Sequence, residues 1–595
     1  MVRLSENARA VLARRYLLRD ELGQPTETAE ELFRRVAVAV AEAEPPAERA
    51  QAAGRFEARM AALEFLPNSP TLMNAGRDHG QLAACFVLPV EDDLGSIFDA
   101  LKWAALIHQS GGGTGFSFSR LRPKGDLVRT THGVASGPVS FIRVYDAATE
   151  TIKQGGVRRG ANMAVLRVDH PDVLEFVDSK RGPGLANFNI SVAATDAFMQ
   201  AVEEAGSFAL RHPRSGAEVR RLDARELLDR IATAAWESGE PGLVFLDRVQ
   251  AANATPDLGP IEAVNPCGEQ PLLPFEACTL GSVNLARFER RGRVDWEALG
   301  GCVRDGVRFL DDVLDVNAWP LPQIEAVSHR NRKIGLGVMG WADLLVRLGV
   351  PYDSPGALSL ADELMAFVAR EARAESQALA ARRGPFPGWA TSAPARAGLP
   401  PRRNATVTTI APTGTLSVIA GCSSGIEPLF ALAYVRHALG GVDLPEENPV
   451  LAEMLRRTGA RRAEEAIQAS GRARGVAGVP EEIQRLFATA HDVSPEDHVR
   501  VQAAFQRHTD NGVSKTINLP RGAPVQAVAG AFRLAHRLGC KGITVYRDGS
   551  REGQVLTSGL PRNGEACPQC EAPLFRTGGC LTCRSCGYAT CETTS

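Results

Sequence analysis

The chain has 595 residues, of which 44% are hydrophobic and 23% are charged, and its formal net charge is −2. This is the composition of a globular protein large enough for more than one domain. A net charge near zero provides no field suited to nucleic acid or to an anionic membrane. No apolar run approaches the ~20 residues that span a bilayer, and residues 1–6 lack the apolar core of a signal peptide. We therefore expect a cytoplasmic protein that binds neither nucleic acid nor a membrane.

Helix and strand patterns divide the chain into four parts. Residues 1–62 are rich in Ala, Arg and Glu at helical spacing and predict a helical N-terminal segment. From 63 to 548, short apolar strands alternate with amphipathic helices, which predicts an α/β domain. Residues 549–566 are polar and contain Gly and Pro, as in a linker, and they lead to a cysteine-rich tail at 567–595.

The elements expected within 63–548 follow from β-branched runs and helical spacing. The expected strands are 83–90, 164–168, 187–192, 406–410, 514–520 and 541–549. The expected helices are 227–237, 303–315 and one that opens within 91–97 and is capped by Asp93 or Ser96. Residues 440–500 read as a helical insertion.

One short stretch carries a compact set of reactive groups. Residues 265–269 read Asn-Pro-Cys-Gly-Glu, and Cys278 follows eleven residues after Cys267. In an extended or looped backbone, which the Pro and Gly favour over a helix, the side chains of Asn265, Cys267 and Glu269 point the same way and face one substrate together. A carboxylate moves a proton, an amide holds a hydroxyl, and sulfur acts as a nucleophile or one-electron partner. A single cysteine is more often a packing residue, but this context favours a catalytic one.

Twelve cysteines in a reducing compartment indicate metal or redox chemistry, and six of them lie in residues 567–595. Two Cys-x-x-Cys knuckles separated by a hairpin-sized loop predict a structural Zn²⁺ site. We assign the zinc to Cys567, Cys570, Cys580 and Cys583. The alternative second knuckle consists of Cys583 and Cys586, so the sequence leaves open which four of the six thiols bind zinc.

The Asn-Pro-Cys-Gly-Glu stretch closely resembles the active-site finger loop of the ribonucleotide reductase catalytic subunit. The resemblance implies that Cys267 becomes a thiyl radical and takes the 3′-hydrogen of a ribonucleotide, while Glu269 deprotonates the 3′-hydroxyl and Asn265 holds it. It implies that Cys85 and Cys278 form the dithiol that reduces the 2′-carbon. It also implies a ten-stranded α/β barrel of two five-stranded halves, with the loop that carries Cys267 threading its centre.

The same resemblance implies binding residues and a mobile dithiol. The implied substrate-binding residues are Ser69, Thr71, Ala84, Gly113, Ala411, Pro412, Thr413, Gly414 and Thr415. The implied effector-binding residues are Asp92, Ser96, Ile97 and Arg122. In the tail, the spacing of Cys586 and Cys591 matches the C-terminal dithiol with which reductases reduce the buried pair.

The source of the radical separates the classes of this family. Class I catalytic subunits carry two adjacent tyrosines near the end of the barrel, whereas this chain has Tyr546 preceded by Val545. The pattern resembles class II enzymes, in which adenosylcobalamin generates the radical. The alternative is a catalytic subunit fed by an external radical-generating subunit. A zinc-ribbon protein that binds nucleic acid is a rival of another kind, and the near-neutral charge speaks against it.

Class II membership implies the following partners: ribonucleoside diphosphates as substrates for DNA precursor synthesis, deoxynucleoside triphosphate effectors, a thioredoxin-like reductant and a second copy of the chain in a homodimer. The sequence leaves the choice between diphosphates and triphosphates, the effector rules and the oligomeric state open.

Overall fold

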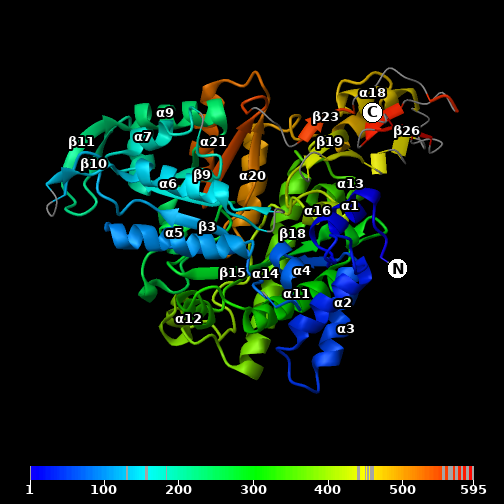
Figure 1. The fold of residues 1–595 in the computed structure, drawn as a ribbon. Helices are drawn as coiled ribbons and strands as arrows, with labels where there is room; N and C mark the ends of the chain where they lie inside the picture. The colour runs from blue at the N-terminus through cyan, green and yellow to red at the C-terminus, as the bar shows by residue number, and fades with distance from the viewer. Residues whose placement is uncertain are drawn as a thin grey trace.

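The structure is a computed structural model that describes residues 2–591 apart from several short segments, with only the backbone described at some residues beside them. The segments left out are 79, 129–131, 155–157, 183, 439–441, 449, 452–453, 456–460, 552–555, 561–566, 570–573, 578–579 and 584–587. Figure 1 shows a central body of strands enclosed by helices, with the N-terminal helices on one side.

Three helices form the N-terminal segment: α1 (Glu6–Arg15), α2 (Ala29–Ala41) and α3 (Arg49–Ala61). Helix α2 begins with a capping box, in which Thr28 and Glu31 satisfy each other's backbone N–H groups. Its apolar face, including Leu32, Phe33 and Val36, is buried. Helices α2 and α3 pack against α11 (Trp296–Val316), as Figure 1 shows. The expected helical N-terminal segment is confirmed.

The first half of the barrel is a run of five parallel strands joined by helices on the outside. The strands are β2 (Cys85–Leu88), β3 (Gly113–Ser117), β8 (Asn162–Arg167), β9 (Phe188–Ala194) and β12 (Gly242–Phe245), in that order. The helices between them include α5 (Leu94–Gln109), α6 (Pro138–Thr151), α7 (Val173–Asp178), α8 (Asp196–Glu203) and α9 (Ala224–Ser238). Parallel strands need such crossovers, and both faces are covered.

The second half consists of β15 (Glu276–Asn284), β18 (Ile334–Met339), an extended segment at 406–410, β21 (Thr516–Leu519) and β22 (Gly542–Arg547). Neighbouring members of this half also run parallel. Its helices include α11, α12 (Pro322–Asn331), α13 (Trp341–Leu348), α14 (Pro355–Arg383), α20 (Pro495–Gln506) and α21 (Val525–Arg537). The two halves meet antiparallel, β2 against β15 and β12 against β22.

These pairings close a circuit of nine strands and the segment 406–410 within the described residues, which confirms the ten-membered barrel. The short strand β1 (Phe65–Pro67) adds to β15 on the outside of this circuit. The expected continuous strand at 406–410 is instead held by single bridges, Leu336 to Thr408 and Ile410 to Val513. The backbone N–H of Val407 donates to the carboxylate of Asp510 at 2.9 Å, which removes it from the ladder.

The insertion after the barrel segment is not purely helical. Strands β19 (Ala433–Ala438), β20 (Val442–Glu447) and β23 (Leu556–Ser558) form a three-stranded sheet, beside helices α18 (Arg461–Ser470) and α19 (Glu481–Leu486). The expectation of a helical segment from 440 onward is therefore wrong at its start. The polar groups of Tyr434, Arg436 and Glu446 pair across β19 and β20, and these partners were not apparent from spacing alone.

The cysteine-rich tail contributes three short antiparallel strands: β24 (Leu574–Thr577), β25 (Cys580–Cys583) and β26 (Ala589–Cys591). Among the residues that the structure describes, no helix is both long enough and apolar enough to cross a membrane.

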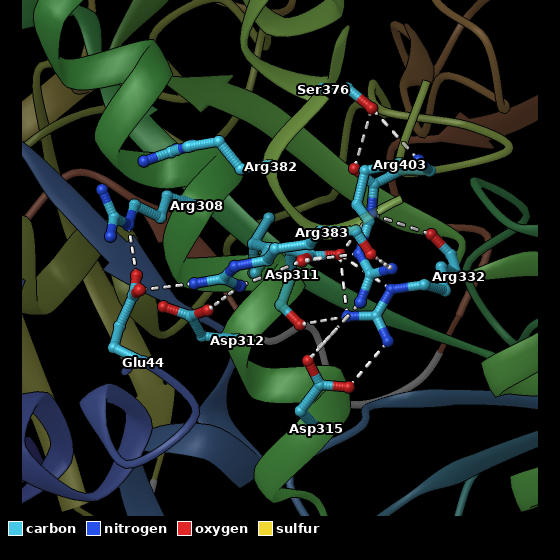
Figure 2. Close-up of polar contacts among 12 residues, drawn as sticks. Glu44, Arg308, Asp311, Asp312, Asp315, Arg332, Ser376, Arg382, Arg383 and Arg403 are labelled. Atoms are coloured by element: carbon cyan, nitrogen blue, oxygen red, sulfur yellow. Dashed lines mark hydrogen bonds and ion pairs between the residues drawn. The ribbon is translucent and has the colours of Figure 1, made fainter. Parts of the chain in front are cut away.

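A buried ionic network fastens the N-terminal helices to the barrel (Figure 2). Glu44, which follows α2, pairs with Arg308 of α11 and with Arg383 at the end of α14. Arg383 also lies 2.6 Å from Asp312 and 3.4 Å from Asp311. Burial raises the pKa of Asp312, and the charge of Arg383 opposes that rise. Since all three carboxylates are fully buried, each depends on the arginines for compensation.

Candidate active site

A short hairpin inside the barrel carries the Asn-Pro-Cys-Gly-Glu stretch. Its arms are β13 (Ala263–Val264) and β14 (Pro271–Leu272), which pair antiparallel. The tip is closed by the N–H of Gly268, which donates to the carbonyl of Asn265 at 3.0 Å. Gly268 has a φ of 81°, a left-handed conformation that favours glycine, so this residue is required by the turn.

Glycines on the surrounding barrel give the hairpin its space. A Cβ atom on Gly115 of β3 would lie 1.9 Å from the carbonyl oxygen of Val264. One on Gly512 would lie 2.7 Å from the carbonyl oxygen of Gly268. The hairpin is also bound to the wall, because the N–H of Gly512 and the hydroxyl of Thr409 both donate to the carbonyl of residue 269, at 2.8 and 2.9 Å. The tip is therefore fixed by close packing and by hydrogen bonds.

The three motif side chains do not all point the same way. Asn265 and Glu269 are buried, and both meet Cys85: the amide of Asn265 donates to Cys85 Sγ at 3.0 Å, and the thiol lies 3.9 Å from Glu269 Oε1. Cys267, at the outer end of the turn, is exposed. The segment is a tight turn rather than an extended strand, and a site in which all three groups face one substrate stays a prediction.

The two expected reducing thiols face each other across neighbouring strands. Cys85 of β2 and Cys278 of β15 are direct partners in the antiparallel pairing of the two barrel halves. Directly opposed residues in such a pair have Cα atoms roughly 4.5–5.5 Å apart, within the range that a disulfide spans. The fold therefore brings together two cysteines that are almost two hundred positions apart in sequence. A disulfide bond between them needs no large movement.

The carboxyl group of Glu269 is poised to titrate near neutral pH. Burial raises the pKa of Glu269 to about 7, against hydrogen bonds to its carboxylate that lower it. Its Oε2 atom is buried and has no hydrogen-bond partner among the described residues. A carboxyl group in this state suits a general base or acid at the operating pH.

A cavity of about 560 Å³ opens beside Cys267. It is bounded by the tip of the hairpin, by strands β9, β12, β21 and β22, and by the side chains of Phe430 and His491. Tyr546 of β22 lines it, and Val545 is buried in the strand. The single exposed thiol of the hairpin thus faces a space large enough for part of a bulky ligand.

The segment 411–417 forms the turn and helix start that its sequence predicts, with α16 (Leu416–Ala420) following. Thr413 is left-handed, with a φ of 55°, and its hydroxyl accepts from the N–H of Gly425 at 2.8 Å. Ala411, Pro412 and Thr415 are half-buried, and Gly414 is exposed. An exposed turn that leads into a helix presents N–H groups to an anion, although the short helix gives a weak dipole.

The remaining substrate-binding predictions fall on or beside β2, β3 and α4 (Ser69–Asn74), with two of them next to Cys85. Ala84 and Gly113 are half-buried, and Gly113 is the partner of Cys85 in the β2–β3 pairing. Ser69 begins α4, where its hydroxyl lies 2.8 Å from that of Tyr16. Thr71 is fully buried, and its hydroxyl donates to the carbonyl of residue 82 at 2.9 Å. Substrate contacts by these residues stay predictions.

The predicted effector residues lie together at the start of α5, outside the barrel. The Arg122 guanidinium pairs with Asp92 at 3.0 Å. Ser96 accepts a hydrogen bond from the backbone at 3.2 Å, and Ile97 is buried. Of the two expected caps of this helix, Asp93 is the one that binds the N–H of Ser96. Their role in binding an effector stays a prediction.

Most of the tail predictions lie beyond what the structure describes. Cys570 and Cys586 are outside the described residues, and only the backbone is described at Cys580, Cys583 and Cys591. Cys567 is buried. Within the described residues no group of three or more Cys, His, Asp or Glu side chains forms a metal site. The zinc ligands and the mobile dithiol therefore stay predictions.

Three features of the site were missed from the sequence. Gly115 in β3 and the spaced pair Gly335 and Gly337 in β18 make room for the hairpin and what lies beside it. Glycine in alternate positions of a strand signals close backbone approach and could have revealed them. Lys333 forms a buried ion pair near Cys278, and His491 reaches the cavity from the insertion; no local pattern signals either.

A closed α/β barrel holds an exposed cysteine at the tip of an internal hairpin with two facing thiols beside it, an arrangement suited to an oxidoreductase. Two family models match the chain: "Ribonucleotide reductase, barrel domain" over residues 83–546 and "Ribonucleotide reductase, all-alpha domain" over residues 2–80. The chain therefore belongs to the ribonucleotide reductase family.

Similar proteins include the vitamin B12-dependent ribonucleoside-diphosphate reductase of Mycobacterium tuberculosis, 50% identical over 99% of this chain and 85% of the relative. The Thermoplasma acidophilum protein with the same description is 46% identical over 94% of this chain and 81% of its own. Among solved structures, the class Id ribonucleotide reductase alpha subunit of Actinobacillus ureae aligns with a TM-score of 0.75 at 24% identity, covering 92% of this chain and 97% of that one. The last likeness concerns the fold.

Proposed function

We propose that this protein reduces ribonucleoside diphosphates to 2′-deoxyribonucleoside diphosphates for DNA precursor synthesis, with adenosylcobalamin as the radical source. The observation that carries the proposal is the placement of Cys267, exposed on a cavity at the tip of a fixed hairpin, beside the facing thiols Cys85 and Cys278. The printed names of the M. tuberculosis and T. acidophilum relatives support the substrate and the vitamin.

The chain's own groups account for the reduction. The Cys267 thiyl takes the 3′-hydrogen and returns it at the end. Glu269 accepts the proton of the 3′-hydroxyl, a step for which a pKa of about 7 is suited. The Cys85 and Cys278 thiols together supply two electrons and two protons, so the 2′-hydroxyl leaves as water and the pair becomes a disulfide. Asn265, which binds both Cys85 and the backbone of residue 270, holds these groups in register.

The cavity of about 560 Å³ beside Cys267 is large enough to receive part of the cofactor next to the thiol. Adenosylcobalamin supplies, when bound, the one-electron oxidant for the Cys267 thiol. The cavity walls include Gly239, Gly242 and Gly542. Gly242 and Gly542 allow β12 and β22 to approach closely, because a Cβ on either would lie 2.9 or 3.1 Å from a carbonyl oxygen of the other strand. Tyr546 lines the same cavity with Val545 before it, so a pair of adjacent tyrosines is absent from this strand. This favours the cofactor over an external radical-generating subunit.

The remaining parts of the proposal rest on the family resemblance. Deoxynucleoside triphosphate effectors would bind at the start of α5, and a thioredoxin-like reductant would restore the Cys586–Cys591 dithiol, which reduces the buried pair. A Zn²⁺ ion held by Cys567, Cys570, Cys580 and Cys583 would fold the tail, a segment too small for a sufficient core of its own. The protein would act in the cytoplasm as a homodimer.

The test is a turnover assay with the purified chain, dithiothreitol and each ribonucleoside diphosphate and triphosphate, with and without adenosylcobalamin. We expect deoxynucleoside diphosphates to form only when the cofactor is present. Product formed without cobalamin, or only after a second protein is added, would favour the alternative subunit architecture. Faster reduction of triphosphates would overturn the assigned substrate class.

A further inference from the structure

A buried ion pair lies beside the inner thiol of the reducing pair. Strands β15 and β18 run parallel with Thr279 opposite Ile334, so Lys333 is the neighbour of Cys278 on the adjoining strand. The Lys333 ammonium lies 2.7 Å from Glu276 Oε2, and both side chains are buried. Asn331 donates to the other oxygen of Glu276 at 2.6 Å. Both carboxylate oxygens of Glu276 thus have a hydrogen-bond partner.

The desolvation cost of burying two charges often exceeds the energy of their attraction. A contribution to stability is therefore a weak explanation for the presence of this ion pair. Its position is nevertheless firmly determined. Figure 2 shows Arg332 between Asp311 and Asp315, to which its guanidinium binds at 3.0 and 2.6 Å. Arg332 is left-handed, with a φ of 46°, and Lys333 follows it directly. The ionic network therefore fixes the backbone from which Lys333 reaches toward the thiols.

The two thiols consequently have opposite surroundings. Burial raises the pKa of Cys85, and the carboxyl group of Glu269 raises it further. Burial also raises the pKa of Cys278, but there the charge of Lys333 lowers it, ahead of smaller opposing effects from Glu276 and Glu269. Cys85 is also slightly exposed, at 4%, whereas Cys278 is at 0%. Cys278 thus lies near a buried cation, whereas Cys85 lies near the carboxyl group of Glu269 and accepts a hydrogen bond from Asn265, which lowers its pKa.

We propose that Lys333 is a positioning residue that sets the direction of re-reduction: the reductant attacks the sulfur of Cys85, and Cys278 leaves as the thiolate. The attacking thiolate forms a bond to Cys85 Sγ while the Cys85–Cys278 bond breaks, and the electron pair remains on Cys278 beside the ammonium. A second thiol of the reductant then resolves the mixed disulfide, releases Cys85 and leaves the reductant as a disulfide. The thiol that leaves more readily is the one with the lower pKa. This inference rests on the proposed function for the existence of the disulfide.

The first test maps the attacked sulfur on the unchanged chain. The protein is oxidised with diamide, exposed briefly to 2-mercaptoethanol, quenched with acid and alkylated with N-ethylmaleimide. We expect peptide mass spectrometry to find the mercaptoethanol adduct on Cys85 and the maleimide on Cys278. Adducts mainly on Cys278, or equally on both, would overturn the inference. Because the oxidation is chemical, the result stands whether or not the protein reduces nucleotides, so its failure is distinct from failure of the proposed function.

The second test measures the rate at which dithiothreitol reduces the Cys85–Cys278 disulfide as a function of pH. The neutral double variant Lys333→Gln/Glu276→Gln keeps hydrogen-bonding groups at both positions and leaves no unpaired charge. Of the two charges that this variant removes, Lys333 has the larger effect on the pKa of Cys278, so the net result is a higher pKa for that thiol. A leaving thiol with a higher pKa departs more slowly, here by up to about tenfold. We expect the double variant to show that slowing and a changed pH profile. The single variant Lys333→Arg, in which Glu276 is unchanged, should recover the wild-type rate.

The titratable groups around this site are Glu269 on the hairpin, Glu276 on β15, Cys85 on β2, Lys333 beside β18 and Lys541. The charge of Lys333 lowers the pKa of Lys541. The double variant removes the charges of Lys333 and Glu276 and leaves Glu269, Cys85 and Lys541 in place. A matched control is Arg35→Gln/Glu27→Gln, which neutralises another mostly buried pair, 2.8 Å apart, in the N-terminal segment and outside the ionic network. Equal slowing in the control, or no change in the Lys333 double variant, would show that the pair is only structural.

Discussion

A single methyl group on the barrel wall should disable the reaction without unfolding the protein. In Gly115→Ala the new Cβ would lie 1.9 Å from the carbonyl oxygen of Val264, more than an ångström short of the roughly 3.3 Å that such contacts need. The hairpin must therefore move by at least that much. A misplacement of about 1 Å costs about 100-fold in rate, or roughly 2.7 kcal/mol of transition-state stabilisation.

The assay is the amount of deoxynucleotide formed in a single turnover, measured beside thermal unfolding. We expect Gly115→Ala to lose about 100-fold in rate and about 1–3 kcal/mol in stability, the usual range for overpacking. The control is Gly530→Ala in α21, where a Cβ meets nothing within 4 Å; it should keep its rate and gain a little stability. Full turnover by Gly115→Ala would refute the claim that close packing positions the hairpin.

Three further predictions concern other parts of the molecule. Because the base works in its ionised form and its pKa is raised to about 7, the single-turnover rate should rise with pH up to about 7 and then level, and Glu269→Gln should abolish this profile; a flat wild-type profile would contradict the assigned role. Arg383→Met should lower the free energy of unfolding by about 3–5 kcal/mol in urea titrations, because it leaves buried carboxylates uncompensated. The control is Arg382→Met, which removes an exposed arginine 3.4 Å from Glu375 and should cost under about 1 kcal/mol. Equal losses in the two variants would show that the network does not stabilise the protein. Metal analysis should find about one zinc per chain in Cys586→Ser and none in Cys570→Ser, because only the second is in the assigned ligand set; zinc lost with Cys586 would favour the alternative knuckle.

The sequence predicted the family and its barrel better than it predicted the geometry of the site. The motif at 265–269 and the order of Cys85, Cys267 and Cys278 identified the family, and the family implied the barrel. The orientation of the three motif side chains was not predictable from alternation, because the turn closed by Gly268 overrides it. A tight turn is a local feature, but its depth inside the barrel depends on Gly115 and Gly512, which are distant in sequence.

Long-range electrostatics were the least visible part. Glu44 lies more than two hundred residues before Asp312 and Arg383 in the sequence. Nothing in the local sequence patterns marks the three residues as partners. Lys333 and Glu276 likewise become neighbours only when β15 and β18 pair. The strand β20 escaped prediction for a similar reason, since its cross-strand partners stabilise a segment whose own composition reads as helical.

The most direct test of the central claim is one turnover without external reductant. With adenosylcobalamin and a ribonucleoside diphosphate, deoxynucleotide and a Cys85–Cys278 disulfide should form in equal amounts, as measured by chromatography and peptide mass spectrometry. Cys267→Ser should give neither, because a serine O–H bond is too strong to replace the thiol. Cys540→Ala, which removes a buried cysteine away from the hairpin, should give both. Product from Cys267→Ser, or product from the unchanged chain with Cys85 and Cys278 still reduced, would contradict the account.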